Sequence, residues 1–171
     1  MQLGLDISTT TVGYALVTKN HIQELGFIDL KKYTDLSEKA WHCFNKLSDY
    51  IDLDKIHNII VEDSLSGFSR GRTSQQTIIK LAKFNAIVCF LLEHQLQKQP
   101  ILVNATTARK QLFGKSRVKG MTAKDFVREQ IEKKFDVKSY MKTTRTGLWD
   151  KRNMDALDAL VVSKYLLPLT K

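Results

Sequence analysis

Residues 3–18 read LGLDISTTTVGYALVT, a pattern that predicts two strands joined by a tight Ser/Thr turn. Side chains alternate across a strand, so Leu3, Leu5 and Ile7 share one face of the first strand while Gly4 and Asp6 share the other. We expect Gly4 to leave room for a ligand or a nucleic-acid backbone beside the Asp6 carboxylate. The alternative is an Asp6 that caps the following turn.

The rest of the chain alternates apolar runs of strand length with longer helical segments. A third strand enters through the Lys19-Asn20 turn, and Asp35 followed by Glu38 resembles a capping box. This pattern predicts an α/β protein with a mixed sheet and a single domain spanning residues 1–171. The expected strands are 21–28, 56–63 and 101–104, and the expected helices are 35–50, 74–97, 106–113, 122–135 and 152–167.

Three further acidic positions lie on apolar elements. Glu62 and Asp63 end the apolar run IHNIIVED, and neighbouring residues of a strand face opposite sides, so the sequence does not decide which of them faces Asp6. Asp155 and Asp158 are three residues apart on an apolar helix and share one helical face. The alternative for Glu62 and Asp63 is that they only solubilise the end of the strand. The alternative for Asp155 and Asp158 is that they are acids in a first helical turn, capped by Asn153, where they favour the helix dipole.

The net charge of +9 is concentrated in one segment. Residues 105–152 hold fourteen Lys and Arg and five Asp and Glu, whereas the chain on either side is neutral. A local excess of this kind predicts a surface for phosphates, with a solvated basic face as the alternative. Buried carboxylates beside such a surface favour bound divalent metal, and together they predict a metal-dependent nuclease.

Composition excludes several other classes. No apolar run reaches the length of a membrane span, and the chain opens directly into a strand, so we expect a cytoplasmic protein. Cys43 and Cys89 lie far apart in the sequence, which favours reduced, buried thiols, and the scattered histidines make a zinc site unexpected.

The order LGLDISTTTVGYALV, IIVEDS and NMDALDALVVSKYL resembles the RuvC-type Holliday-junction resolvases of the RNase H-like superfamily, in a form similar to bacteriophage versions. The resemblance spans nearly the whole chain. It implies an RNase H-like fold, in which three antiparallel strands and then two parallel strands form a five-stranded mixed sheet with helices on both faces. It also implies a homodimer that cleaves branched DNA such as four-way junctions, forks or flaps in a bacterial host.

By the same resemblance, the catalytic carboxylates that bind two Mg²⁺, with Mn²⁺ able to substitute, would be Asp6, Glu62, Asp155 and Asp158. Lysines near the scissile phosphate would be Lys110, in Thr-Ala-Arg-Lys-Gln, and Lys124, in Thr-Ala-Lys-Asp-Phe-Val, with Lys119 as a rival for the second position. At the family's aromatic wedge position the nearest aligned residue is Leu65, a departure from the pattern.

Two loops are predicted to contact DNA. In residues 64–73, Phe68 could stack on a base while guanidinium groups contact phosphates, or the segment is an ordinary loop. The loop GKSRVKG between two expected helices could follow a DNA strand, or form a solvated turn. The predicted DNA-contacting residues of these loops are Phe68, Arg70, Arg72, Lys115, Arg117 and Lys119.

The helix expected at 74–97 is apolar around most of its circumference, which predicts a twofold dimer contact unless the helix is buried in its own domain. Other functions remain open. An RNase H-type or pre-ribosomal RNA nuclease would share the carboxylates, and a non-catalytic nucleic-acid-binding module would use only the basic segment. The opening GLDISTTTVGYAL also resembles the phosphate loop of actin-like ATPases and sugar kinases, although the second domain and second phosphate loop of that fold are not found.

Overall fold

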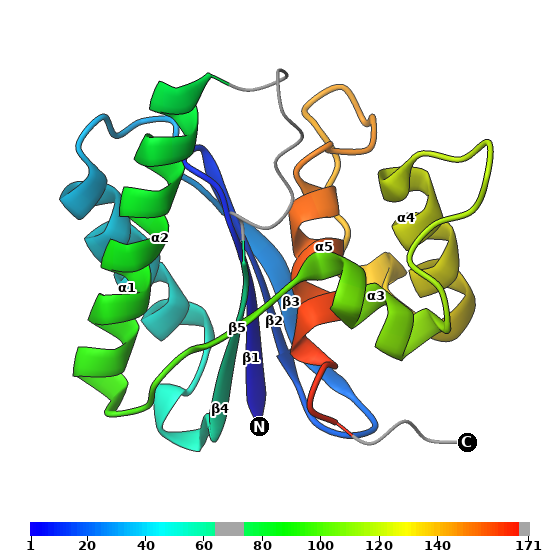
Figure 1. The fold of residues 1–171 in the computed structure, drawn as a ribbon, viewed down its shortest axis with the longest axis horizontal. Helices are drawn as coiled ribbons and strands as arrows, with labels where there is room; N and C mark the ends of the chain where they lie inside the picture. The colour runs from blue at the N-terminus through cyan, green and yellow to red at the C-terminus, as the bar shows by residue number, and fades with distance from the viewer. Residues whose placement is uncertain (64–73, 168–171) are drawn as a thin grey trace.

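A computed structural model describes residues 1–63 and 74–167 of the chain (Figure 1). The centre is a five-stranded sheet with the order β3-β2-β1-β4-β5. The pairs β1–β2 and β2–β3 are antiparallel, whereas β1–β4 and β4–β5 are parallel. This confirms the predicted mixed sheet. The strands are β1 Gln2–Ile7, β2 Thr11–Val17, β3 Ile22–Asp29, β4 Asn58–Glu62 and β5 Ile101–Val103.

Helices cover both faces of the sheet, with α1 and α2 on one face and α3, α4 and α5 on the other (Figure 1). Capping residues set where they begin. Asp35 accepts hydrogen bonds from the backbone of Ser37 and Glu38, and Thr122 accepts one from Asp125. The helices are α1 Leu36–Tyr50, α2 Gln75–Leu96, α3 Ala105–Phe113, α4 Ala123–Lys134 and α5 Asn153–Ser163, with short 3-10 turns η1 Leu53–Lys55 and η3 Lys138–Tyr140.

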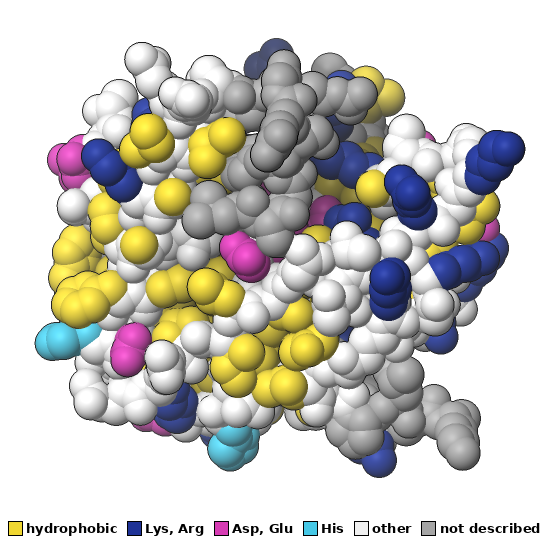
Figure 2. All heavy atoms as spheres, viewed as in Figure 1, with side chains coloured by type: hydrophobic (Ala, Val, Ile, Leu, Met, Phe, Trp, Pro, Cys, Tyr) yellow, Lys and Arg dark blue, Asp and Glu magenta, His cyan; other side chains and the backbone are white. Residues whose placement is uncertain are grey.

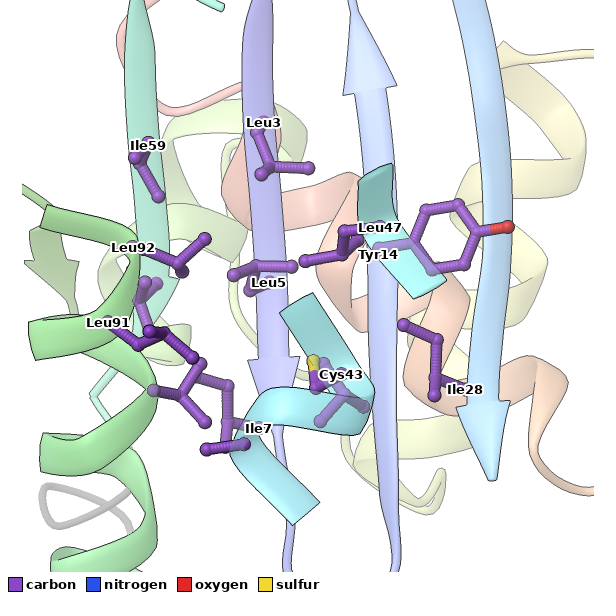
Figure 3. Packing of buried hydrophobic residues seen from close by; sticks show 14 of the residues in the cluster. Leu3, Leu5, Ile7, Tyr14, Ile28, Cys43, Leu47, Ile59, Leu91 and Leu92 are labelled. Carbon is purple, nitrogen blue, oxygen red and sulfur yellow. The ribbon is translucent and has the colours of Figure 1, made fainter. Parts of the chain in front are cut away.

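Strand alternation divides the core into two clusters. Leu3, Leu5 and Ile7 of β1 face α1 and α2, where they pack with Cys43 and Leu92 (Figure 3). The opposite face of the sheet packs against α5, whose apolar side chains are nearly all buried. Since a helix buried around its circumference leaves little room for charge, the acidic residues of α5 stand out in this layer.

Two glycines let α5 lie directly on the sheet. A Cβ at Gly4 would lie 2.3 Å from the carbonyl oxygen of Ala159, and a Cβ at Gly13 would lie 1.9 Å from that of Asp155. Gly4 was predicted to leave room for a ligand, and that prediction is wrong, because the helix takes the space. The consequence for the site is that the first turn of α5 rests on the strand paired with β1.

The last helix differs from the prediction at both ends. The last helix ends at Ser163 rather than at residue 167, and Arg152 takes the cap position in place of Asn153. Asn153 instead binds the backbone of Lys142 with its side chain. Cys43 and Cys89 are both free thiols, the first buried and the second half-buried. Among the described residues, no helix has the length and apolar character needed to cross a membrane.

Candidate active site

Asp6 and Glu62 lie next to each other on the α5 face of the sheet. The parallel register of β1 and β4 pairs Gly4 with Ile60 and Leu5 with Val61, which brings the following residues, Asp6 and Glu62, to the carboxyl ends of adjacent strands. Ile60 belongs to the core cluster that contains α5, so Glu62, two residues later, shares that face.

Asp63 lies on the other side of the sheet. Its side chain lines a cavity of about 310 Å³ together with Ala82 and Cys89 of α2. Its backbone nitrogen donates to the carbonyl oxygen of Val103 at 2.8 Å. The sequence leaves open which of the two acids shares a face with Asp6. In the structure, Glu62 lies on the face that carries Asp6, and Asp63 does not.

The two aspartates of α5 face the same end of the sheet. Asp155 is in the first turn, held against β2 by the close contact at Gly13. Asp158 is one turn further along the helix and is buried, with 8% of its surface exposed. The structure thus places carboxylates from β1, β4 and α5 at one end of the sheet.

Burial raises the pKa of all four carboxyl groups, and the charges of neighbouring carboxylates add to the rise at Asp6, Glu62 and Asp155. Burial, and then the charges of Glu62, Asp158 and Asp155, raise the pKa of Asp6 well above its usual value. Burial followed by the charge of Asp158 raises the pKa of Glu62 to about 7. Burial also raises the pKa of Asp155 to about 6, although Lys124 opposes this rise. The ionised form of each of these carboxyl groups is therefore disfavoured in the metal-free protein.

Arg109 and Lys124 are two of the cationic groups that act on the cluster, and Arg152 also lowers the pKa of Asp155. The guanidinium of Arg109, on α3, donates from Nη2 to Oδ1 of Asp158 at 2.9 Å, and both side chains are largely buried. Burial raises the pKa of Asp158, and Arg109 opposes that rise through its charge and its hydrogen bond. Lys124, in the first turn of α4, lowers the pKa of Asp6, Asp155 and Asp158.

Lys110 is exposed on α3, whereas its neighbour Arg109 pairs with Asp158 of the cluster. The signal was present in the sequence: Ala108 and Leu112 form the buried stripe of α3, and Arg109 borders that stripe while Lys110 points away from it. Lys119, the rival of Lys124, is also exposed, whereas Lys124 acts on three of the four carboxyl groups.

The donor set suits a hard divalent cation, because carboxylate oxygens are the ligands that Mg²⁺ prefers. As the side chains lie, no three His, Cys, Asp or Glu residues within 1–63 and 74–167 form a ready coordination group. Asp158 is paired with Arg109 in this arrangement, so that carboxylate is engaged by a cation rather than free for a metal.

A basic surface borders the cluster. Figure 2 shows Lys and Arg side chains gathered over α3, α4 and the segment between them, on the right of the view. Lys115, Arg117 and Lys119 of that segment are all exposed. The positions of the predicted contacts Phe68, Arg70 and Arg72 are outside the described residues.

Comparison with solved structures shows which known proteins share this fold. Solved structures similar to this chain include RuvC of Thermus thermophilus, with a TM-score of 0.62 at 14% identity over 95% of this chain and 92% of the other. The chain has the fold of the RuvC resolvases.

Two further structures share the RuvC fold. T. thermophilus RuvC in complex with a Holliday junction substrate has a TM-score of 0.61 at 10% identity, covering 95% of this chain and 91% of that one. The yeast mitochondrial Holliday junction resolvase Ydc2 has a TM-score of 0.61 at 15% identity, covering 95% of this chain and 75% of that one. No protein-family model and no curated protein matches the chain.

Proposed function

We propose that this protein is a Mg²⁺-dependent, structure-selective endonuclease that cleaves branched DNA such as Holliday junctions, acting as one nuclease domain over residues 1–171. The observation that carries the proposal is the cluster of Asp6, Glu62, Asp155 and Asp158 beside a basic surface. The RuvC fold supports it, since one of the similar structures holds a Holliday junction substrate.

In this proposal, each residue of the cluster has a chemical role. Two bound Mg²⁺ ions, for which Mn²⁺ could substitute, would activate the attacking water and stabilise the leaving 3′ oxygen, giving 5′-phosphate and 3′-hydroxyl ends. Asp6 and Glu62, on adjacent strand ends, would share the metal ligands, and Asp155 and Asp158 would complete the set from α5. Lys124 would offset charge that develops on the phosphate.

Arg109 takes the role that the sequence led us to give Lys110. Its guanidinium is already in contact with Asp158, so it fixes that carboxylate and adds a positive charge close to the phosphate position. Lys110, Lys115, Arg117 and Lys119, all exposed, would contact the backbone of the bound DNA instead.

We also propose a homodimer through α2. Val88, Leu91 and Leu92 of this helix are buried against the sheet, but Ile79 and Phe90 are exposed, Phe90 by 67%. Leu102 on the edge strand β5 is exposed as well, and the left half of Figure 2 shows apolar side chains over this region. A symmetric pair of sites would suit cleavage of two strands of a junction in processes such as DNA recombination, repair or bacteriophage DNA processing.

The test is cleavage of matched four-way, three-way, forked and linear DNA, and of RNA–DNA and RNA duplexes, with and without Mg²⁺. We expect nicks near the branch point, only with Mg²⁺ or Mn²⁺, and ends that carry a 5′-phosphate. Preferential cleavage of an RNA-containing duplex would replace this function with an RNase H-type or pre-ribosomal RNA nuclease. Binding without cleavage on every substrate would leave only a binding module.

A further inference from the structure

A small hairpin of residues 142–152 stands between α4 and α5 (Figure 1, orange). Thr143 and Trp149 form an antiparallel bridge, and the backbone nitrogen of Thr144 donates to the carbonyl oxygen of Leu148 at 2.7 Å. Gly147, with a φ of +79°, closes the turn through its backbone nitrogen, which donates to Thr144. None of the DNA contacts proposed above comes from this 142–152 hairpin.

The base of the hairpin is fixed to the start of α5. The buried side chain of Asn153 accepts a hydrogen bond from the backbone nitrogen of Lys142 at 3.0 Å and donates to its carbonyl oxygen at 2.8 Å. Arg152 pairs with Asp150 of the hairpin and with Asp29 at the end of β3. These contacts give the hairpin a defined direction relative to the helix that carries Asp155.

A second anchor comes from α4. The guanidinium carbon of Arg128 lies 4.7 Å from the centre of the Trp149 ring, over its face. Lys124, one turn earlier on the same helix, acts on the pKa of Asp155. The hairpin base therefore lies within the group of elements that surrounds the carboxylate cluster, at the end of the sheet where β1 and β4 finish (Figure 1).

The tip of the hairpin is exposed and carries both positive charge and apolar surface. Leu148 is 68% exposed. Arg145 in the turn and Lys151 at the base are both exposed, and no described carboxylate forms an ion pair with either one. Arg152, in contrast, is neutralised by its two aspartates. Unpaired cations beside one exposed apolar side chain fit a nucleic-acid backbone, which offers phosphates and the apolar faces of sugars and unstacked bases.

We propose that the 142–152 hairpin is a DNA-contacting element, in which Arg145 binds a backbone phosphate of the arm next to the cleavage position and Leu148 packs on the adjoining sugar or base. This inference rests on the proposed function, because the cluster sets where the DNA lies. The hairpin would give the enzyme an anchor on the DNA that is independent of the loop between α3 and α4.

The test compares Arg145→Glu with Lys19→Glu, which makes the same change of charge in the exposed β2–β3 turn at the opposite end of the sheet. Affinity for a four-way junction is measured in Ca²⁺ or EDTA over a range of salt concentrations, with Arg145→Ala and Leu148→Ser alongside. We expect Arg145→Glu to weaken binding by about tenfold or more and Lys19→Glu by less than about twofold, a contrast typical of a direct phosphate contact. Arg145→Ala should reduce the slope of log affinity against log salt by about 0.9. Leu148→Ser should weaken binding but leave that slope unchanged.

Thermal unfolding checks that each variant folds, and since the tip lies outside both core clusters, none should lose stability. Equal weakening by Arg145→Glu and Lys19→Glu would overturn the hairpin contact, because total charge alone would then explain binding. If the wild-type protein cleaves junctions and Arg145→Glu binds them as tightly as the wild type does, only this inference would be overturned. Failure of the wild-type protein to bind any branched DNA would overturn the proposed function and the hairpin contact with it.

Discussion

Replacing Glu62 with Gln should make the metal-free protein more stable at pH 8. Burial and the charge of Asp158 raise the pKa of Glu62 from 4.5 to about 7, which means that the folded state resists ionisation of this carboxyl group. At about 1.4 kcal/mol for each pKa unit, the difference corresponds to about 3 kcal/mol of lost stability once Glu62 is ionised. For a chain of this size that is a shift of roughly 6 to 12 °C in Tm.

The pH dependence has a definite sign. A carboxyl group whose pKa is raised on folding binds more protons in the folded state, so it favours folding below its unfolded pKa and loses that effect as the pH rises through its folded pKa. The advantage of Glu62→Gln over wild type should therefore be small near pH 4.5 and grow until about pH 7, then stay constant.

The assay is thermal unfolding in EDTA between pH 4.5 and pH 8, repeated with Mg²⁺. Mg²⁺ should stabilise the wild-type protein, by roughly 2.7 kcal/mol at a hundredfold excess over Kd, and should have little effect on Glu62→Gln. Asp63→Asn is the matched control, since Asp63 lies on the other face of the sheet and should leave the response to Mg²⁺ intact. A Glu62→Gln protein that is no more stable at pH 8 than wild type, and that still responds fully to Mg²⁺, would refute the reasoning.

Three further predictions address other parts of the structure. Arg109→Ala should lower the free energy of unfolding in EDTA by roughly 3 kcal/mol, because it leaves the buried Asp158 charge unpaired, and urea unfolding of Lys110→Ala should show no such loss. Gly13→Ala should lower the free energy of unfolding by about 1–3 kcal/mol or more in the same urea assay, since the added carbon meets the backbone of Asp155. A variant with unchanged stability and unchanged cleavage would contradict that contact. If the proposed dimer forms in solution, Phe90→Glu should convert it to a monomer in sedimentation equilibrium, and a dimer mass that this variant leaves unchanged would contradict an interface through α2.

Much of the fold follows from local patterns in the sequence. Alternation in LGLDIS and TVGYALV gave the first two strands, and the capping residues Asp35 and Thr122 marked where α1 and α4 begin. These features depend on a few neighbouring residues, so the sequence alone is sufficient to identify them.

The details of the site depend on contacts between distant segments. Whether Glu62 or Asp63 faces Asp6 is decided by the register between β1 and β4, which no local pattern contains. Gly4 looked like space for a ligand because the position of α5 on the sheet could not be foreseen. The family resemblance implies a lysine near the phosphate and so points to Lys110, whereas the position of Arg109 beside the buried stripe of α3 depends on how that helix packs.

Cleavage by the Asp6→Asn variant tests the central claim most directly. Asp6 is half-buried, and the charges of the other three carboxylates act on it, so the change removes one potential metal ligand while altering little of the side chain's shape. Wild-type protein and variant would each be mixed in excess with a four-way junction, in Mg²⁺, and followed through a single turnover. We predict junction binding close to that of wild type with no detectable cleavage, whereas nicking by Asp6→Asn at the wild-type rate would contradict the account.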